Sequence, residues 1–317
     1  MSVTFDDITQ AHGRIAPFIH RTPVYSSRII NDIVGGQLFF KCENFQKGGA
    51  FKARGAFNAV HSLDEAMVKK GVVTHSSGNH AAAVALAANS RNTIAHVVMP
   101  SNASAVKKAA VMGYGATVIE CAPILADREA TAEEIIRETG ATFLHPYDDE
   151  RVIAGQGTAA LEMIEDLSKT GHSLDIVMCP VGGGGLLAGT ALTARSLLPE
   201  AQVIAAEPLG ADDAKRSFDA GVLIEQTAPN TIADGLLTSV GKTNFPIIMQ
   251  NVDEILTVSE QSIVHAMRLI WQHMKLVVEP SAAVPLAALL SREVGLGDKK
   301  VGIILSGGNV DLDRLPW

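Results

Sequence analysis

The feature that most constrains the fold is a repeated alternation of short apolar runs with longer helical patterns. The runs are rich in β-branched residues and are continuously apolar, which is typical of strands buried on both faces. Strands that alternate with helices in this way predict an α/β fold of open parallel sheets with helices on both faces. The predicted strands are 72–75, 96–99, 116–121, 175–181, 202–206, 254–258 and 301–305, and the predicted helices are 77–89, 104–112, 126–139 and 185–197.

Length and composition allow two domains. The chain has 317 residues, of which 47% are hydrophobic and 19% charged, enough for a sizeable core and too little charge for disorder. The stretch 62–146 holds three or four strand–helix pairs and is predicted as a small unit, while 1–61 and 147–317 build a larger one. Because ligands of open α/β sheets bind beyond the carboxyl ends of the strands, we expect the site in the cleft between these domains.

Charge and cysteine content exclude several classes of protein. A net charge of −8 and the absence of a Lys/Arg run argue against a nucleic-acid partner. The most apolar run, 81–88, is too short to span a membrane, and the acidic N-terminus is not a secretion signal. Three widely spaced cysteines, Cys42, Cys121 and Cys179, are typical of free thiols in a reducing compartment. We therefore expect a cytoplasmic protein.

Three segments carry residues suited to cofactor chemistry. Lys52 lies among small and apolar residues, where burial would lower its pKa and help it act as a base, although it could also lie on a solvated helix face. Four glycines, 182–185, follow a predicted strand and open a helix, so their backbone N–H groups can bind a phosphate. Ser306 follows the last strand, either in a plain tight turn or with its hydroxyl facing a cofactor.

Other segments leave alternatives open. The spacing of Gly183, Gly185 and Ala188 also fits the dinucleotide fingerprint, with Glu207 placed to bind a ribose, as in a nicotinamide-dependent dehydrogenase. The turn 76–80 could cap a helix or bind a substrate carboxylate. Glu207 and its acidic neighbours could lie in a solvated loop or supply oxygen ligands to a cation.

Taken together, these segments resemble the serine racemase and serine/threonine dehydratase family of fold-type-II pyridoxal-phosphate enzymes, most closely its serine racemase branch. The resemblance covers nearly the whole chain, and it explains the glycines by the phosphate of pyridoxal phosphate rather than by a dinucleotide. The motifs that carry it are Phe39-Phe40-Lys41-Cys42-Glu43, Phe51-Lys52-x-Arg54-Gly55-Ala56, Thr74-His75-Ser76-Ser77-Gly78-Asn79-His80, Ile153-Ala154-Gly155-Gln156-Gly157-Thr158, Pro180-Val181 with the glycines, Thr231-Ile232-Ala233-Asp234-Gly235 and Leu305-Ser306-Gly307-Gly308-Asn309.

The resemblance implies a tryptophan-synthase-β-like fold with pyridoxal phosphate in the interdomain cleft and with 62–146 as a mobile small domain. Lys52 would bind the cofactor covalently, and Ser306 would meet its pyridine nitrogen. A neutral hydroxyl at that nitrogen suits elimination or racemisation better than transamination. The full set of implied cofactor-binding residues is Phe51, Lys52, Asn79, Gly182, Gly183, Gly184, Gly185, Leu186 and Ser306.

The resemblance also assigns the catalytic pair. The serine that matches Ser77 lies, in the racemase branch, on the cofactor face opposite the lysine, so Lys52 and Ser77 would supply the two proton-transfer groups of a racemase. Elimination to a keto acid and ammonia needs only Lys52, so we expect both reactions on small β-hydroxy amino acids. The implied substrate-binding residues are Ser76, Ser77, Asn79, His80 and Arg128.

A divalent cation and a homodimer are further implications of the resemblance. Glu207, Asp213 and the carbonyl group of Ala211 match the branch's cation site, which would take Mg²⁺, Ca²⁺ or Mn²⁺. Two residues depart from the branch: Ala50 replaces a common serine, and Tyr147 stands where mammalian-type racemases carry asparagine. With Arg128, which would bind a second substrate carboxylate, these departures keep an alternative open, an L-threo-3-hydroxyaspartate or threonine ammonia-lyase with little racemase activity.

Overall fold

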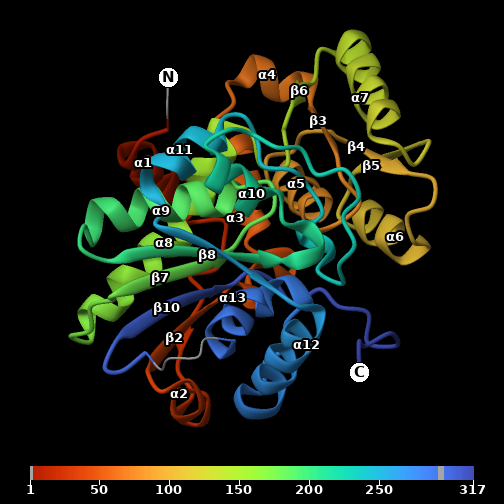
Figure 1. Ribbon diagram of the computed structural model, residues 1–317. Helices are drawn as coiled ribbons and strands as arrows, with labels where there is room; N and C mark the ends of the chain where they lie inside the picture. The colour runs from red at the N-terminus through yellow and green to blue at the C-terminus, as the bar shows by residue number, and fades with distance from the viewer. Residues whose placement is uncertain (1–2, 292–295) are drawn as a thin grey trace.

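The computed structural model describes residues 3–291 and 296–317, which form two separate sheets (Figure 1). The larger sheet has the strand order β1-β2-β10-β7-β8-β9. Its neighbouring strands are parallel except for the short β1, which is antiparallel to β2 and which the sequence did not predict. These strands are β1 (Val24–Tyr25), β2 (Gln37–Cys42), β7 (Ile176–Pro180), β8 (Gln202–Pro208), β9 (Glu254–Val258) and β10 (Lys300–Leu305).

The smaller sheet has four parallel strands in the order β5-β4-β3-β6. All four lie within the stretch predicted as the small unit. They are β3 (Val72–His75), β4 (Ala95–Pro100), β5 (Thr117–Cys121) and β6 (Thr142–Phe143), and the helices α5 (Asn79–Ser90), α6 (Ala105–Gly113) and α7 (Leu125–Thr139) pack beside them. The prediction of an α/β fold with two open, essentially parallel sheets is therefore confirmed.

Helices cover both faces of the larger sheet, which explains why its strands are continuously apolar. Along β7, Val177 and Cys179 pack into one core with α8 and α9, whereas Ile176 and Met178 pack into the other core with α12 and α13. The helices outside the small sheet are α1 (Phe5–Ile15), α2 (Arg28–Val34), α3 (Lys52–His61), α4 (Glu65–Lys70), α8 (Glu150–Lys169), α9 (Gly185–Leu197), α10 (Asp213–Ala220), α11 (Asn244–Asn251), α12 (Glu260–Leu269) and α13 (Pro280–Leu290). None of the helices in the described residues is long and apolar enough to cross a membrane.

Close helix crossings bring α3 against α8. A Cβ atom on Gly155 would lie 2.6 Å from the carbonyl oxygen of Arg54, and one on Gly157 would lie 2.9 Å from that of Gly189. Both distances are shorter than any van der Waals contact, so only glycine allows α8 to approach α3 and α9 this closely. This packing fixes α3, whose first residue is Lys52.

Candidate active site

The predicted site residues lie beyond the carboxyl ends of strands in both sheets. The four glycines follow β7, Ser306 follows β10, and the turn that holds Ser77 follows β3. The backbone N–H group of Phe51 donates to the carbonyl oxygen of Ser306 at 2.9 Å, which ties the start of α3 to the end of β10. This is the place at which ligands bind in open α/β sheets.

Lys52 is a buried amine rather than a solvated one. Its Nζ donates a hydrogen bond to the carbonyl oxygen of Pro146 at 2.8 Å and lies 5.2 Å from the ring centre of Phe51. Burial lowers the pKa of this amine to about 8, and the carboxylate of Glu279 opposes that shift. A larger fraction of the amine is therefore neutral at neutral pH than for a lysine in water, as a base or nucleophile requires.

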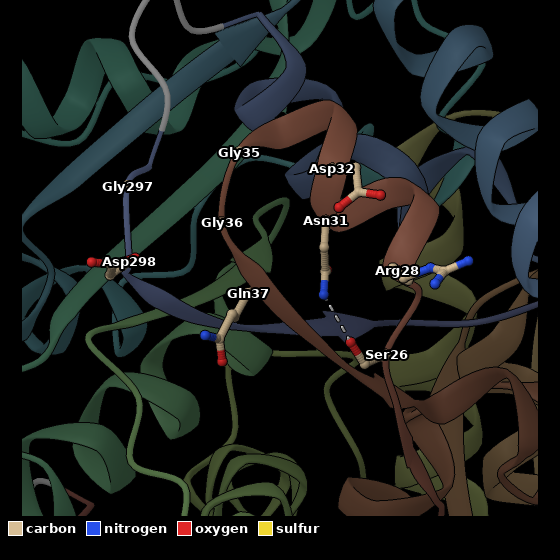
Figure 2. Close-up of a pocket in the computed structure, with 9 residues that line it drawn as sticks. All are labelled: Ser26, Arg28, Asn31, Asp32, Gly35, Gly36, Gln37, Gly297 and Asp298. Atoms are coloured by element: carbon tan, nitrogen blue, oxygen red, sulfur yellow. Dashed lines mark hydrogen bonds between the residues drawn. The ribbon is translucent and has the colours of Figure 1, made fainter.

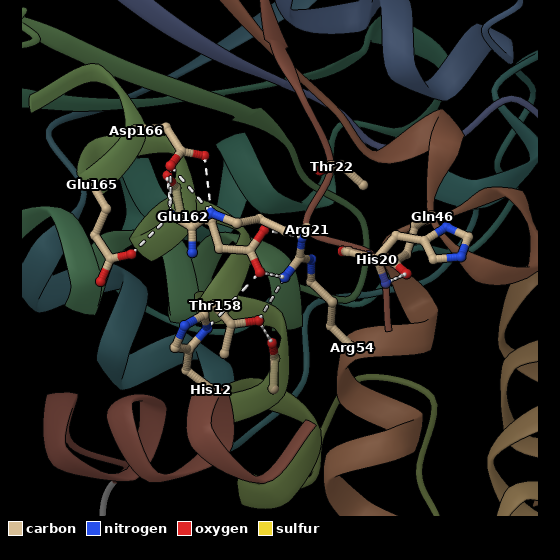
Figure 3. Close-up of polar contacts among 12 residues, drawn as sticks. His12, His20, Arg21, Thr22, Gln46, Arg54, Thr158, Glu162, Glu165 and Asp166 are labelled. Carbon is tan, nitrogen blue, oxygen red and sulfur yellow. Dashed lines mark hydrogen bonds and ion pairs between the residues drawn. The ribbon is translucent and has the colours of Figure 1, made fainter. Parts of the chain in front are cut away.

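A buried ion cluster anchors α3 just behind this lysine (Figure 3). The fully buried guanidinium group of Arg54 donates to Glu43 and to Glu162, with 2.7 Å for each of the shortest contacts, and to the hydroxyl of Thr158 at 3.1 Å. Burial acts to raise the pKa of Glu162, but the charges of Arg54 and Lys41 outweigh it and lower the pKa to about 2. Removing one member would leave buried charges unpaired, at a cost of roughly 3–5 kcal/mol.

The four glycines form a cradle that has no room for side chains. A Cβ atom on Gly183 would overlap the ring of Tyr147, and one on Gly185 would lie 2.8 Å from the carbonyl oxygen of that tyrosine. Gly184 has a φ of +93° and caps α9 without a side-chain hydrogen bond. The first N–H groups of a helix have no acceptor within it, so this end of α9, including the buried Leu186, fits a phosphate group.

Ser306 is the second feature that fits the predicted cofactor. The residue is only 2% exposed, and its Oγ is buried without a hydrogen-bond partner among the described residues. A buried hydroxyl without a partner is destabilising and is usually explained by a ligand or a function. A ring nitrogen is a partner of the required kind, so Ser306 and the cradle together fit the two ends of pyridoxal phosphate.

Glu279 is a site residue that the sequence analysis missed. Its carboxylate accepts hydrogen bonds from Nδ2 of Asn79 at 3.0 and 3.1 Å and from the backbone N–H group of Asn309 at 3.2 Å. Burial raises the pKa of Glu279 to about 7. Asn79 thus reaches from α5, beside the small sheet, to a residue that caps a helix of the large one. The only signal in the sequence is a Glu-Pro pair that opens a helix.

The turn after β3 holds side chains that are not used to cap α5. Gly78 is the N-cap of that helix and makes no side-chain cap, while Oγ of Ser76 accepts only from the N–H group of Gly78 at 3.3 Å. Ser77 is partly exposed. His80 is packed instead: it is 2% exposed, its Nε2 lies 3.4 Å from the carbonyl oxygen of Leu144, and burial lowers its pKa well below the ordinary value.

Arg128 lies on α7, on the side of the small unit that carries His75 and Cys121. Its guanidinium Nε is buried and has no hydrogen-bond partner among the described residues. An unpartnered guanidinium nitrogen is a ready donor to a carboxylate. The alternative of a fully solvated arginine is therefore wrong.

The predicted cation ligands are buried, so they do not lie in a solvated loop. Glu207 is 0% exposed and accepts from the N–H group of Lys215 at 2.6 Å, and Asp213 is 1% exposed and accepts from that of Val240 at 3.0 Å. Burial raises the pKa of Glu207 to about 8 and that of Asp213 to about 6. In the described ranges, no group of three or more His, Cys, Asp or Glu side chains could hold a metal ion. A cation at this pair would therefore also need backbone or solvent oxygens, such as the carbonyl group of Ala211.

A cavity of about 650 Å³ lies away from all of these residues (Figure 2). It adjoins Gln37, which opens β2, so it is at the amino end of that strand rather than at the carboxyl end. Its lining includes none of the predicted site residues and consists of Ser26, Arg28, Asn31, Asp32, Gly35, Gly36, Gln37, Gly297 and Asp298.

Comparisons with known proteins agree with this geometry. The model of the family described as "Pyridoxal-phosphate dependent enzyme" matches residues 15–307. The chain is 52% identical to the β-hydroxyaspartate dehydratase of Paracoccus denitrificans over 99% of its own length and 98% of that protein. The crystal structure of serine racemase from Dictyostelium discoideum is 51% identical, with a TM-score of 0.94 over 98% of this chain and 100% of that one. The crystal structure of maize serine racemase's more distant relative, the threonine deaminase of T.th., is 44% identical, with a TM-score of 0.93 over 98% of this chain and 100% of that one.

Proposed function

The chain belongs to the family of pyridoxal-phosphate-dependent enzymes, and from this premise we propose that it racemises serine and eliminates water from serine and threonine, releasing a keto acid and ammonia. One observation carries the proposal, the convergence of an amine, a glycine cradle and a buried hydroxyl. Lys52 donates to Pro146, the next residue, Tyr147, lies against Gly183, and the residue before Lys52 binds Ser306.

The residues present fit the cofactor. Lys52 would hold its aldehyde carbon, Phe51 would lie beside the ring, Asn79 would bind the 3-oxygen and Ser306 the ring nitrogen. The phosphate would be bound by the backbone of Gly182, Gly183, Gly184, Gly185 and Leu186. When bound, pyridoxal phosphate supplies the electron withdrawal that makes the α-proton of an amino acid acidic.

The chain's own residues would then move the protons. The lowered pKa of Lys52 lets the neutral amine take the α-proton from one face of the substrate. The hydroxyl of Ser77 would return a proton to the opposite face, which inverts the α-carbon. If the β-hydroxyl group leaves before that proton returns, the product is a keto acid and ammonia.

A second candidate function is favoured by Arg128. Its buried Nε has no hydrogen-bond partner among the described residues, and the second carboxylate of L-threo-3-hydroxyaspartate could supply one. The relative from Paracoccus denitrificans is named for a dehydratase of this substrate class. This alternative is an ammonia-lyase for 3-hydroxyaspartate or threonine with little racemase activity.

We also propose a divalent cation, Mg²⁺ or in its place Ca²⁺ or Mn²⁺, between Glu207 and Asp213 with the carbonyl group of Ala211. Burial, with the charge of Asp213 added to it, raises the pKa of Glu207, and a cation would offset both effects. A homodimer is proposed from the resemblance alone and is tested by light scattering on the purified protein. A cytoplasmic location is supported by the free thiols of Cys42, Cys121 and Cys179.

Residues 62–146 are proposed as a small domain that closes on the large one, formed by 1–61 and 147–317. The contacts that support a mobile junction are few and polar: Asn79 with Glu279, and the exposed ion pair of Lys107 with Asp234 at 3.2 Å. Exposed pairs of this kind contribute little stability, roughly 0–1 kcal/mol. Crystals of the free and the inhibitor-bound protein test the proposal, and identical positions of the small sheet in both would contradict it.

The experiment that tests the function uses the purified protein with L-serine in heavy water containing Mg²⁺. We expect pyruvate together with D-serine that carries deuterium at the α-carbon. Pyruvate without labelled D-serine would replace the racemase proposal with the ammonia-lyase alternative, and L-threo-3-hydroxyaspartate and threonine would then be compared as substrates. Neither product from any of the three substrates would overturn both proposals.

A further inference from the structure

A side-chain amide outside all of the motifs joins the glycine cradle to the lysine segment. Asn244 opens α11 and is 0% exposed. Its Nδ2 donates to the carbonyl oxygen of Gly183 at 2.8 Å and to that of Tyr147 at 3.0 Å. Because both partners are acceptors, the amide can lie only with its nitrogen towards them. Both of its N–H bonds are used, one on each side of the junction between cradle and lysine segment.

The other end of this amide has no partner. Oδ1 of Asn244 is buried and accepts no hydrogen bond from the described residues. A buried oxygen without a donor destabilises the fold, whereas an apolar side chain at the same place would carry no such cost. The two donated hydrogen bonds are therefore the contribution of this residue that offsets its unpaired oxygen.

The surroundings of Asn244 hold it rigidly. Oδ1 of Asp148 accepts from the backbone N–H groups of Thr243 at 2.8 Å and of Asn244 at 3.2 Å, which supplies the cap that the side chain of Thr243 does not. The N–H group of Gly241 donates to the same Gly183 carbonyl oxygen at 3.0 Å. That carbonyl group is thus held by two donors from the segment 241–244.

Holding this carbonyl group also orients the next N–H group. In a trans peptide, the C=O bond of one residue and the N–H bond of the next point in opposite directions. With the carbonyl of Gly183 fixed towards Asn244, the N–H group of Gly184 must point away from Asn244. The second hydrogen bond fixes Tyr147, whose neighbour Pro146 accepts from Lys52.

We propose that Asn244 is a positioning residue for the cofactor phosphate, which keeps the backbone donors of the cradle aligned and in register with Lys52. This inference rests on the proposed function, since it assigns the cradle to the phosphate of pyridoxal phosphate. Asn244 itself binds neither cofactor nor substrate. Its loss should therefore weaken the binding of a phosphorylated ligand more than that of the same ligand without phosphate.

The test is a titration of the apoprotein with pyridoxal phosphate and, separately, with pyridoxal. For Asn244→Leu, which keeps the approximate size but has no donor, we expect the Kd for pyridoxal phosphate to rise roughly 10- to 100-fold, as for the loss of two buried hydrogen bonds. The Kd for pyridoxal should change less than about threefold, and the ³¹P resonance of the bound cofactor should shift. Equal rises for both ligands, or no rise for either, would overturn the inference.

Two further variants keep the test decisive. Asn251→Leu removes an amide at the other end of α11, where Nδ2 donates only to Ile247 at 2.8 Å, and it should leave both Kd values unchanged. If Asn244→Leu does not fold, the smaller Asn244→Ser keeps one donor and should give an intermediate rise for pyridoxal phosphate alone. Failure of the unaltered protein to take up pyridoxal phosphate at Lys52, seen by borohydride reduction and peptide mass, would instead overturn the proposed function.

Discussion

The two sheets contribute to the site in different ways. The six-stranded sheet contributes backbone and fully buried groups, namely the glycine cradle, the 2%-exposed Ser306 and a lysine anchored by the buried Arg54 cluster. The four-stranded sheet contributes Ser77, Asn79 and Arg128, which are partly exposed side chains. The first set is held by tertiary packing, whereas the second rests on a few polar contacts.

This difference separates two tasks. Rigid, buried donors are suited to holding a cofactor in one position, since they need no reorganisation when it binds. Side chains on a movable unit are suited to contacting the substrate and completing the reaction once it is enclosed. The comparison therefore predicts that changes on the large sheet abolish all chemistry, whereas changes on the small sheet alter which reaction or substrate is preferred.

The largest effect is expected for Lys52→Ala. Both racemisation and elimination should fall to the background rate, because each begins with the same proton transfer. Racemase and pyruvate assays on the same preparation measure this. Lys69→Ala, an exposed lysine on α4, is the matched control and should keep full activity. Residual elimination well above background in Lys52→Ala would show that the lysine is not the base.

Ser77→Ala should separate the two reactions. Racemisation should fall by roughly 10²–10⁴-fold, the usual contribution of a positioned acid or base, while much of the elimination from L-serine remains. The measurement is the ratio of D-serine to pyruvate. Ser90→Ala, near the end of the helix that follows Ser77, is the control. Unchanged racemisation in Ser77→Ala would remove the two-face assignment and with it the special role of the small sheet.

Arg128→Met should change the choice of substrate rather than the chemistry. We expect the KM for L-threo-3-hydroxyaspartate to rise roughly 10- to 100-fold, the equivalent of one charge-assisted hydrogen bond. The KM for serine, which has no second carboxylate, should hardly change. Arg137→Met, on the exposed end of the same helix, is the control. Equal rises for both substrates would mean that Arg128 supports the fold of the small unit instead.

The sequence predicted the elements whose patterns are local. The strand Glu254–Val258 and the helix Gly185–Leu197 have the predicted bounds, because an apolar run and a glycine-led helix start are visible without tertiary context. The strand Gln37–Cys42 was not predicted as such, since its buried Lys41 interrupts the apolar pattern. That lysine is inside the protein only because Glu162, 121 residues away, accepts its hydrogen bond at 2.7 Å.

The same limit applies to the site. Lys52 and the glycines stand in recognisable motifs, so their chemistry could be predicted. Glu279 and Asn244 stand in no motif, and their contacts join segments that are far apart in the chain: Asn79 lies 200 residues from Glu279, and Gly183 lies 61 from Asn244. A polar residue whose role depends on such a contact has no signature in a single sequence.

The smallest effect is expected for the cation pair, which tests whether buried groups of the large sheet are always complete in themselves. Mg²⁺ should raise the melting temperature of the protein, because a ligand at a hundredfold excess over its Kd adds about 2.7 kcal/mol of stability. Glu207→Gln should abolish that gain, while Asp219→Asn, an exposed partner of Lys215 on α10, should keep it. The measurement is the difference in melting temperature between Mg²⁺ and EDTA. No difference for the unaltered protein would mean that Glu207 and Asp213 are satisfied by their backbone donors alone, and that this edge of the large sheet needs no cation.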